Sequence, residues 1–200
     1  MQHRIALLAL ATALGAGAGI GAAVYLARGS NSVVEPSRPA ATWAPGVRRA
    51  PDFRLVDQLG RPVSLASLRG RTAIVTFIDP VCRNLCPLEA QVLTRVEHDL
   101  GPSAPALLAV SINPHADTLA NFRKDAREWR LPSSWRWALG SQSALARVWR
   151  DYRVGVKPTA GQVVHTEAAY VIDAAGYQRA LFVYPFVAAD VEQVLKTLGI

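Results

Sequence analysis

Cysteine is scarce in this chain, because only two of its 200 residues are cysteine. Two cysteines are too few for the disulfide framework on which small secreted proteins rely, so a bond between them would have a specific role. Half of the residues are hydrophobic, which is enough for one well-packed domain without such a framework. The sequence contains no internal repeat.

A concentrated basic region is also lacking, although the net charge is +7. Residues 1–50 contain five arginines and one glutamate, a net charge of +4, which leaves +3 for the other 150 residues. That larger part has no cluster of Lys and Arg and no aromatic stripe between basic residues. A nucleic-acid-binding surface normally needs such a patch, so we expect no binding of nucleic acid.

Charge is absent from residues 5–27. As an α-helix this run of 23 residues would be about 34 Å long, which is enough to span a bilayer core of about 30 Å. The alternative is a cleaved signal peptide, whose apolar region is normally about 7–15 residues long. We therefore expect a single transmembrane helix within residues 1–28 that anchors the protein in the membrane.

The flanks of this run indicate where the rest of the chain lies. Arg4 precedes the run, so we expect the N-terminus on the cytoplasmic side of the bacterial inner membrane. The C-terminal part would then face the periplasm, where disulfides can persist. Residues 29–50 are rich in Ser, Pro and Arg without apolar periodicity, and we expect them to form a flexible linker.

Residues 51–200 are expected to form one α/β domain. Apolar runs at 73–77 and 106–112 predict buried strands, the second with the character of a parallel strand. The other expected elements are a β-hairpin with strands at 53–56 and 62–65, a helical turn at 67–70, helices at 87–100, 117–129, 142–151 and 187–198, and strands at 137–139, 168–172 and 177–184. This alternation indicates a mixed sheet with helices on both faces.

Both cysteines lie in one short segment, Cys82-Arg-Asn-Leu-Cys86-Pro87, between the strand at 73–77 and the helix that follows. Positions i and i+4 across one helical turn are about 6 Å apart, which is within disulfide range. A disulfide between Cys82 and Cys86 is therefore one prediction. Two thiolates are also soft ligands that select Cu(I), so a copper site is the other.

The sequence leaves open which cysteine is the more reactive. The helix N-terminus and the adjacent Arg83 both favour thiolates. Cys82 should be the more exposed of the two cysteines, whereas Cys86 lies closer to the helix N-terminus.

His165 is the candidate for a third metal ligand. It lies in a loop-like stretch just before the strand at 168–172, and in a thioredoxin-like topology that loop faces the N-terminus of the dithiol helix. An ordinary surface residue is the alternative for this histidine. The other histidines have simpler explanations: His98 on an exposed helix side, His115 at a helix start and His3 beside the anchor.

Four motifs follow one another between about residue 45 and residue 200. They are Phe-Arg-Leu-Val-Asp-x-x-Gly at 53–60, the dithiol segment at 82–87, Ser-Ile-Asn-Pro-His-Ala-Asp-Thr at 111–118, and His-Thr-Glu-Ala-Ala-Tyr-Val-Ile-Asp at 165–173. Together they resemble the Sco/SenC family of membrane-anchored copper proteins. The resemblance implies a thioredoxin-like mixed sheet flanked by helices, preceded by a β-hairpin and a transmembrane helix.

The same resemblance implies a function and a set of site residues. Cys82, Cys86 and His165 would bind copper. The partners would be a copper donor protein and subunit II of cytochrome c oxidase, whose binuclear copper site would receive the metal or have its cysteines reduced.

Three features depart from the usual family pattern. Arg83 and Asn84 replace Pro and Asp, Asn113 replaces the Asp of a Ser-x-Asp-Pro motif, and residues 152–164 contain two cations but no carboxylate. We therefore expect positively charged surroundings for the thiols, which would weaken cation binding and favour redox chemistry.

The leading interpretation is a copper-binding metallochaperone that holds Cu(I) and Cu(II). The alternative is an enzyme, a thiol-disulfide oxidoreductase that reduces a periplasmic partner with little or no copper transport. A peroxidase would need Thr three residues before the reactive cysteine, where Asp79 and Arg83 stand. A purely structural interaction module would not explain why the dithiol and His165 occur together.

Overall fold

The computed structural model describes residues 38–159 and 162–200. The transmembrane helix expected within residues 1–28 lies outside the described residues. Within the described ranges, no helix combines the length and the apolar character needed to cross a membrane.

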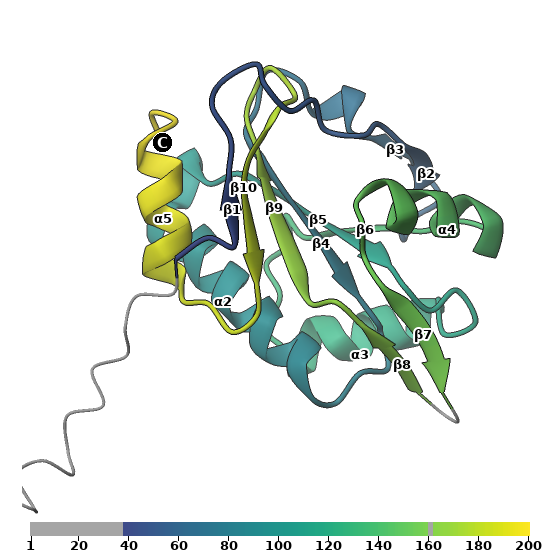
Figure 1. Cartoon of the computed structure of the whole chain (residues 1–200). Coiled ribbons are helices and arrows are strands. Elements are labelled where there is room, and N and C mark those ends of the chain that lie inside the picture. The colour runs from purple at the N-terminus through teal and green to yellow at the C-terminus, as the bar shows by residue number, and fades with distance from the viewer. Residues whose placement is uncertain (1–37, 160–161) are drawn as a thin grey trace, which may run out of the picture. The chain divides into compact units, whose positions relative to one another are not determined.

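A six-stranded mixed sheet forms the centre of the domain, with strand order β1-β10-β9-β4-β5-β6 (Figure 1). Three neighbouring strands are parallel, namely β4 (Ala73–Ile78), β5 (Ala106–Ser111) and β6 (Arg136–Ala138). Every residue of β4 is buried. Parallel strands are normally covered on both faces, which explains why the two central strands are continuous apolar runs in the sequence.

The other half of the sheet is antiparallel. β9 (Ala168–Ile172) pairs with β4, β10 (Gln178–Val183) pairs with β9, and the short β1 (Ala41–Thr42) pairs with β10. The turn between β9 and β10 contains Gly176, whose φ of +87° is a conformation that glycine adopts without steric cost. The predicted mixed sheet is therefore confirmed.

Helices lie on both faces of this sheet (Figure 1). One hydrophobic cluster contains residues from α2 (Leu85–Leu100), α3 (Leu119–Glu128) and α5 (Ala188–Lys196). The opposite cluster contains residues from α4 (Gln142–Asp151) and from the N-terminal hairpin. Alternate residues of β4 supply the two clusters, with Ile74 on the α2 side and Val75 on the α4 side. Short 3₁₀ helices occupy Ala66–Leu68 and Gly101–Ser103.

The predicted N-terminal hairpin is confirmed as β2 (Arg54–Val56) paired with β3 (Pro62–Ser64). Asp57 fixes its turn, because one carboxylate oxygen accepts hydrogen bonds from the amides of Leu59 and Arg61, each 2.9 Å long. The other oxygen lies 2.8 Å from Nε of Arg61. A bridge between Val56 and Leu139 joins the hairpin to the end of β6.

The structure differs from the expected linker over residues 29–50, of which it describes the part from residue 38. Residues 41–42 form β1, Arg49 bridges to Tyr177, and Ala50 is buried. A strand of two residues is too short to produce a periodic pattern, so β1 could not be predicted from the sequence.

A second difference concerns the stretch before β9, which we expected to be a loop. It forms an antiparallel hairpin, β7 (Val156–Thr159) and β8 (Gln162–His165). Pro158 argues against a strand in sequence-based reasoning. It is tolerated here because a two-stranded hairpin has only edge strands, where a missing amide hydrogen need not interrupt pairing.

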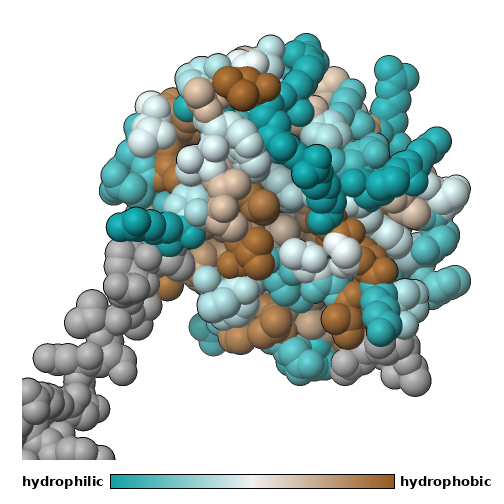
Figure 2. Space-filling view, viewed as in Figure 1, coloured by the Kyte–Doolittle hydropathy of each residue, from teal (hydrophilic) through white to brown (hydrophobic). Residues whose placement is uncertain are grey.

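The face of the domain in Figure 2 shows hydrophobic side chains in separate patches between hydrophilic ones. The exposed large hydrophobic side chains of the described residues are Val47, Val56, Leu59, Leu85, Leu88, Leu119, Val164, Val183 and Val187.

The packing of α2 predicts a contrast between two of its leucines. Leu93 is fully buried, whereas Leu88 is 45% exposed. Leu93→Ala should lower the free energy of unfolding by about 2–5 kcal/mol, because it removes buried methyl groups and leaves a cavity. Leu88→Ala should change it by less than about 0.5 kcal/mol. Equal losses in chemical denaturation would contradict this packing.

Candidate metal and redox centre

The antiparallel pairing of β4 with β9 brings the two predicted site segments together. Thr76 near the end of β4 pairs with Ala169 near the start of β9. The chain that leaves β4 leads to Cys82 and Cys86, and the chain that enters β9 contains His165. Segments that are about 80 residues apart in the sequence therefore meet at one edge of the sheet.

Asp79 shapes the turn between β4 and α2. This buried carboxylate accepts a 2.9 Å hydrogen bond from the amide of Val81, and the Asp79 carbonyl accepts one from the amide of Cys82. The side-chain amide of Asn113 donates to both Asp79 oxygens, at 3.2 and 3.3 Å. An Asp at position 113 would place two carboxylates in contact, so Asn113 fits this turn better.

The two cysteines occupy opposite ends of the turn. α2 begins at Leu85, two residues before the start that Pro87 suggested, so Cys86 lies in the first helical turn. Pro is tolerated there because the first amides of a helix have no partner within it. Cys86 is fully buried and Cys82 is partly exposed, and both are free thiols in the structure. The predicted disulfide therefore remains a prediction.

Three potential ligand atoms form a compact cluster at this turn. The sulfurs of Cys82 and Cys86 and a carboxylate oxygen of Glu167 all lie within 4.8 Å of one another. The side chains of Cys82 and Glu167 line a small pocket of about 140 Å³, beside which Cys86 is buried. The pocket is also lined by Asp79, Val81, Arg83, Asn84, Leu85, Val163, Val164 and His165.

His165 lies next to this three-residue cluster. It is the last residue of β8 rather than a loop residue, and its side chain is only 2% exposed. Its Nε2 atom is 3.6 Å from the sulfur of Cys86 and 3.1 Å from Oε1 of Glu167. Nδ1 lies 3.1 Å from the backbone carbonyl oxygen of Thr166, which can accept a hydrogen bond from it, so Nε2 is the ring atom that faces both Cys86 and Glu167.

The environments of the two thiols separate their pKa values. A hydrogen bond from the Cys86 thiol lowers the pKa of Cys82 to about 6, against burial, with help from the backbone amides of Asn84 and Cys86. The same hydrogen bond, burial and the charge of Glu167 raise the pKa of Cys86. The amides at the start of α2 therefore stabilise a thiolate on Cys82 and not on Cys86.

The charge near the thiols is negative, which differs from the positive surroundings expected from the sequence. Glu167 lies 3.7 Å from the sulfur of Cys86 and is 9% exposed. Arg83 is directed towards the buried Asp125 at 3.7 Å and donates to the Cys82 carbonyl oxygen. Burial disfavours the charged imidazole of His165, but hydrogen bonding to Glu167 and its charge outweigh this, so the pKa of His165 is raised.

Sequence reasoning missed two acidic residues of this centre, Glu167 and Glu89. Glu89 on α2 is fully buried and accepts a 2.6 Å hydrogen bond from Thr76. Burial raises its pKa well above the usual range, and Glu167 adds to the shift. Glu167 stands two residues after His165, a spacing that places side chains on the same side of an extended chain. That spacing was the available signal.

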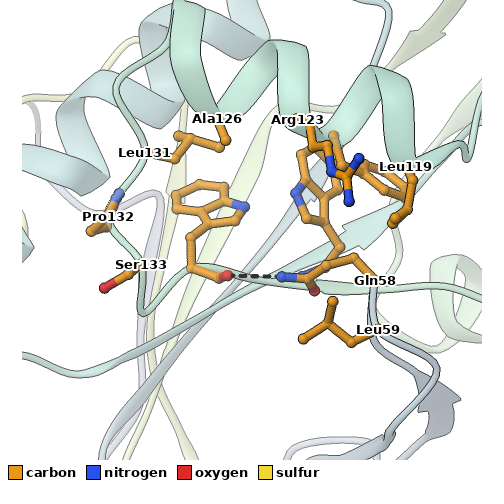
Figure 3. Close-up of a pocket in the computed structure, with 11 residues that line it drawn as sticks. Gln58, Leu59, Leu119, Arg123, Ala126, Leu131, Pro132 and Ser133 are labelled. Atoms are coloured by element: carbon orange, nitrogen blue, oxygen red, sulfur yellow. Dashed lines mark hydrogen bonds between the residues drawn. The ribbon is translucent and has the colours of Figure 1, made fainter.

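A larger pocket of about 230 Å³ lies elsewhere, between α3, the residues before β6 and the turn of the β2–β3 hairpin. Figure 3 shows Ala126 and Leu131 facing Gln58 and Leu59 across it, and Gln58 donates to the carbonyl oxygen of Trp135 at 3.3 Å. None of the described residues that line it is Cys, His, Asp or Glu. The thiol chemistry therefore belongs to the smaller pocket.

The other described histidines line neither of these two pockets. His98 is exposed and adjacent to Asp99, and His115 is exposed. The simpler explanations given for these two residues are consistent with their positions, and His3 lies outside the described residues.

Comparison with known protein families shows to which family this chain belongs. Residues 44–198 match the model of the SCO1/SenC family. The chain belongs to the SCO1/SenC family. The mitochondrial SCO2 homologue of Bos taurus is 31% identical over 109 residues, which cover 52% of this chain and 40% of the relative. This chain therefore matches less than half of the length of that relative.

Solved structures agree with this family at the level of the fold. ScoI of Bradyrhizobium japonicum, solved with copper bound, has a TM-score of 0.64 at 23% identity and covers 74% of this chain and 98% of its own. BsSco, described as a member of the Sco family of cytochrome c oxidase assembly proteins, has a TM-score of 0.67 at 23% identity, with coverages of 78% and 96%.

The thioredoxin domain of a thiol-disulfide oxidoreductase from Bacteroides vulgatus also superimposes, with a TM-score of 0.59 at 20% identity and coverages of 79% and 98%. The predicted thioredoxin-like fold is thereby confirmed for this member of the SCO1/SenC family.

The separated pKa values predict how the two thiols react. Cys82 should be alkylated by iodoacetamide with a rate that reaches half its maximum near pH 6, because its thiolate is stabilised. Cys86→Ala removes the thiol that donates to Cys82, so this midpoint should move up towards the ordinary value of about 8.5. Mass spectrometry identifies the modified residue. Faster modification of Cys86 than of Cys82 would contradict the assignment.

Asp125 predicts a pH dependence of stability in this SCO1/SenC protein. Burial raises its pKa to about 7, against the attraction of Arg83. An acid whose pKa is raised by folding stabilises the fold below its unfolded pKa of about 4, and this contribution is lost as the pH rises through about 7. Asp125→Asn should therefore be more stable than the native protein at pH 8, by about 1–3 kcal/mol.

At pH 4 the free energy of unfolding of Asp125→Asn should be nearly equal to that of the native protein. The matched control is Asp151→Asn on the exposed side of α4, which should give the same difference at both pH values. A constant effect of Asp125→Asn from pH 4 to pH 8 in chemical denaturation would overturn this account of Asp125.

Proposed function

We propose that this protein is a copper-binding metallochaperone for the binuclear copper site of cytochrome c oxidase. Reduced Cys82 and Cys86 would hold Cu(I), and His165 would complete the site, particularly for Cu(II). The observation that supports this most strongly is the meeting of two sulfurs within 4.8 Å of each other, with Nε2 of His165 3.6 Å from one of them.

The donor set fits copper as cargo. Two thiolates are soft ligands that favour Cu(I), and imidazole nitrogen suits copper in either oxidation state. Ligand atoms that share one small ion at roughly 2.0–2.3 Å lie about 3–4.5 Å apart from one another. The two sulfurs lie within 4.8 Å of each other and Nε2 of His165 lies 3.6 Å from the sulfur of Cys86, so the side chains would have to draw together to close the site around an ion.

The exposure of the site suits transfer of the ion by ligand exchange. Cys82 is partly exposed, so a ligand of a partner protein can reach an ion there while Cys86 and His165 remain buried. Leu85 and Val164 line the same pocket and are exposed. Exposed apolar side chains around a reactive group are typical of a surface that contacts another protein.

The partners and the location belong to this proposal. Subunit II of cytochrome c oxidase would receive the copper, and a separate donor protein would supply it. The N-terminal segment 1–28 would anchor the protein in the bacterial inner membrane, with residues 51–200 in the periplasm. The naming of BsSco as a member of a cytochrome c oxidase assembly family and the copper-bound form of ScoI support the assignment.

A second candidate function is thiol-disulfide exchange. It is supported by the difference between the two cysteines, because Cys82 is partly exposed with a lowered pKa and Cys86 is buried with a raised pKa. The Cys82 thiolate would attack a partner disulfide, form a mixed disulfide and release one partner thiolate. Cys86, after losing its proton, would then attack the Cys82 sulfur and release the second partner thiolate. Two electrons pass to the partner, and a Cys82–Cys86 disulfide remains.

Copper titration separates the two functions. The reduced protein should bind about one equivalent of Cu(I) in competition with a chelator, because both thiolates contact the ion. Cys82→Ser and Cys86→Ser should each lose tight binding. His165→Ala should retain most of the Cu(I) affinity but lose affinity for Cu(II), since imidazole matters more for the oxidised ion.

The control is reduction of a peptide disulfide by the same preparations. Metallochaperone activity predicts tight copper binding whatever the rate of this reaction. Absence of tight Cu(I) binding together with disulfide reduction that requires Cys82 would reject the copper proposal in favour of the oxidoreductase.

A further inference from the structure

Glu167 has a position that its contacts with neighbouring residues do not explain. One of its oxygens lies 3.1 Å from Nε2 of His165 and 3.7 Å from the sulfur of Cys86. The other oxygen is buried and has no partner in hydrogen-bond geometry among the described residues. The neighbouring acidic contact of Glu167 is the buried carboxyl of Glu89, which a second negative charge would destabilise. An unpartnered buried carboxylate oxygen costs free energy, so its retention beside two thiols and an imidazole points to a ligand.

The backbone holds this carboxylate in place. The carbonyl of Glu167 accepts a 3.0 Å hydrogen bond from the amide of Tyr184, and the amide of the preceding Thr166 donates to Gly155 at 3.0 Å. Glu167 is thus fixed between the end of β10 and the residue before β7. These two backbone hydrogen bonds hold the segment so that the side chain of Glu167 lies beside the dithiol.

We propose that Glu167 is a fourth copper ligand that binds Cu(II) and not Cu(I), an inference that rests on the proposed copper function. With Cys82, Cys86 and His165 it would complete a set of two sulfurs, one nitrogen and one oxygen. Glu167 would then determine which oxidation state of the cargo the protein retains.

The preference of each ion for its ligands gives the first reason. Cu(I) is soft and is satisfied by two or three thiolate and imidazole ligands, whereas Cu(II) favours tetragonal sites that include oxygen donors. The carboxylate oxygen of Glu167 is already within 4.8 Å of both sulfurs. The three atoms of this cluster would have to approach one another only slightly to reach the separations of about 3–4.5 Å that ligands of one ion have.

Charge gives the second reason. Two thiolates already leave a bound Cu(I) with a net negative charge, so a third anion at this 9% exposed residue would bury further uncompensated charge. With Cu(II), two thiolates give a site whose net charge is zero. A carboxylate added to Cu(II) therefore meets less repulsion than one added to Cu(I).

The competing role for Glu167 is to orient His165 through the contact of 3.1 Å. A positioning residue and a ligand give different results in a double-mutant cycle. If Glu167 acts through the imidazole, removing its charge has no further effect once His165 is Ala. If Glu167 binds the ion, its removal still changes the Cu(II) site in the His165→Ala background.

The experiment uses the full chain with Glu167→Gln, and Asp117→Asn as the matched control. Asp117 accepts a hydrogen bond from Ser111 with one oxygen, and its other oxygen is buried without a partner among the described residues. It belongs neither to the ligand cluster nor to the lining of the pocket at the dithiol. Glu167→Asp is a second test variant, because it keeps the charge and withdraws the oxygen. The readouts are Cu(I) affinity against a chelator, Cu(II) affinity, and the electron paramagnetic resonance spectrum of the Cu(II) form.

Glu167→Gln should weaken Cu(II) binding at least about tenfold, since loss of a group that merely supports a ligand already costs about 10–100-fold. It should alter the resonance spectrum, in the native and the His165→Ala background, and leave Cu(I) affinity unchanged within about threefold. Glu167→Asp should behave similarly, and Asp117→Asn should change neither ion's binding.

An unaltered Cu(II) spectrum in Glu167→Gln, or an effect that vanishes in the His165→Ala background, would overturn the role of Glu167 while the copper function stands. A native protein that binds no Cu(I) through its cysteines would overturn the proposed function and this inference together. An equal loss of Cu(I) and Cu(II) affinity would also reject the selective role.

Discussion

The antiparallel contact between β4 and β9 is the constraint on which the centre depends. It places the end of one strand beside the start of the other, with Thr76 opposite Ala169, and so fixes the dithiol turn against the segment of His165 and Glu167. The strands are buried between two helical layers, so the separation of the two segments cannot vary without disturbing the core. The reactive groups are thereby supported by buried strands of the central sheet.

Asymmetry between the two thiols is the chemical consequence. Cys82 is partly exposed and its pKa is lowered to about 6, whereas Cys86 is buried beside a carboxylate and its pKa is raised. One exposed thiolate suits contact with a partner, and one protected sulfur suits retention of whatever is bound. Copper transfer and disulfide exchange both use this division of roles, which explains why one fold accommodates either chemistry.

The sequence predicted the parts of this centre that depend on local pattern. The apolar runs identified β4 and β5, and the dithiol segment was located between a strand and a helix. It did not predict the β7–β8 hairpin, because Pro158 obscured the strand pattern, nor the short β1. Glu167 was missed because a single acidic residue is ordinary in sequence, and only the packing of β9 against β4 shows that it faces the sulfurs. The charge near the two thiols was predicted to be positive because Glu167 was not recognised as their neighbour.

X-ray absorption spectroscopy of the Cu(I)-loaded protein tests the central claim most directly, because it counts the atoms bound to the metal. We predict one copper per chain with two sulfur neighbours, and loss of one sulfur in Cys82→Ser. A copper coordinated without sulfur, or shared between two protein molecules, would contradict the account of a dithiol site closed by a single chain.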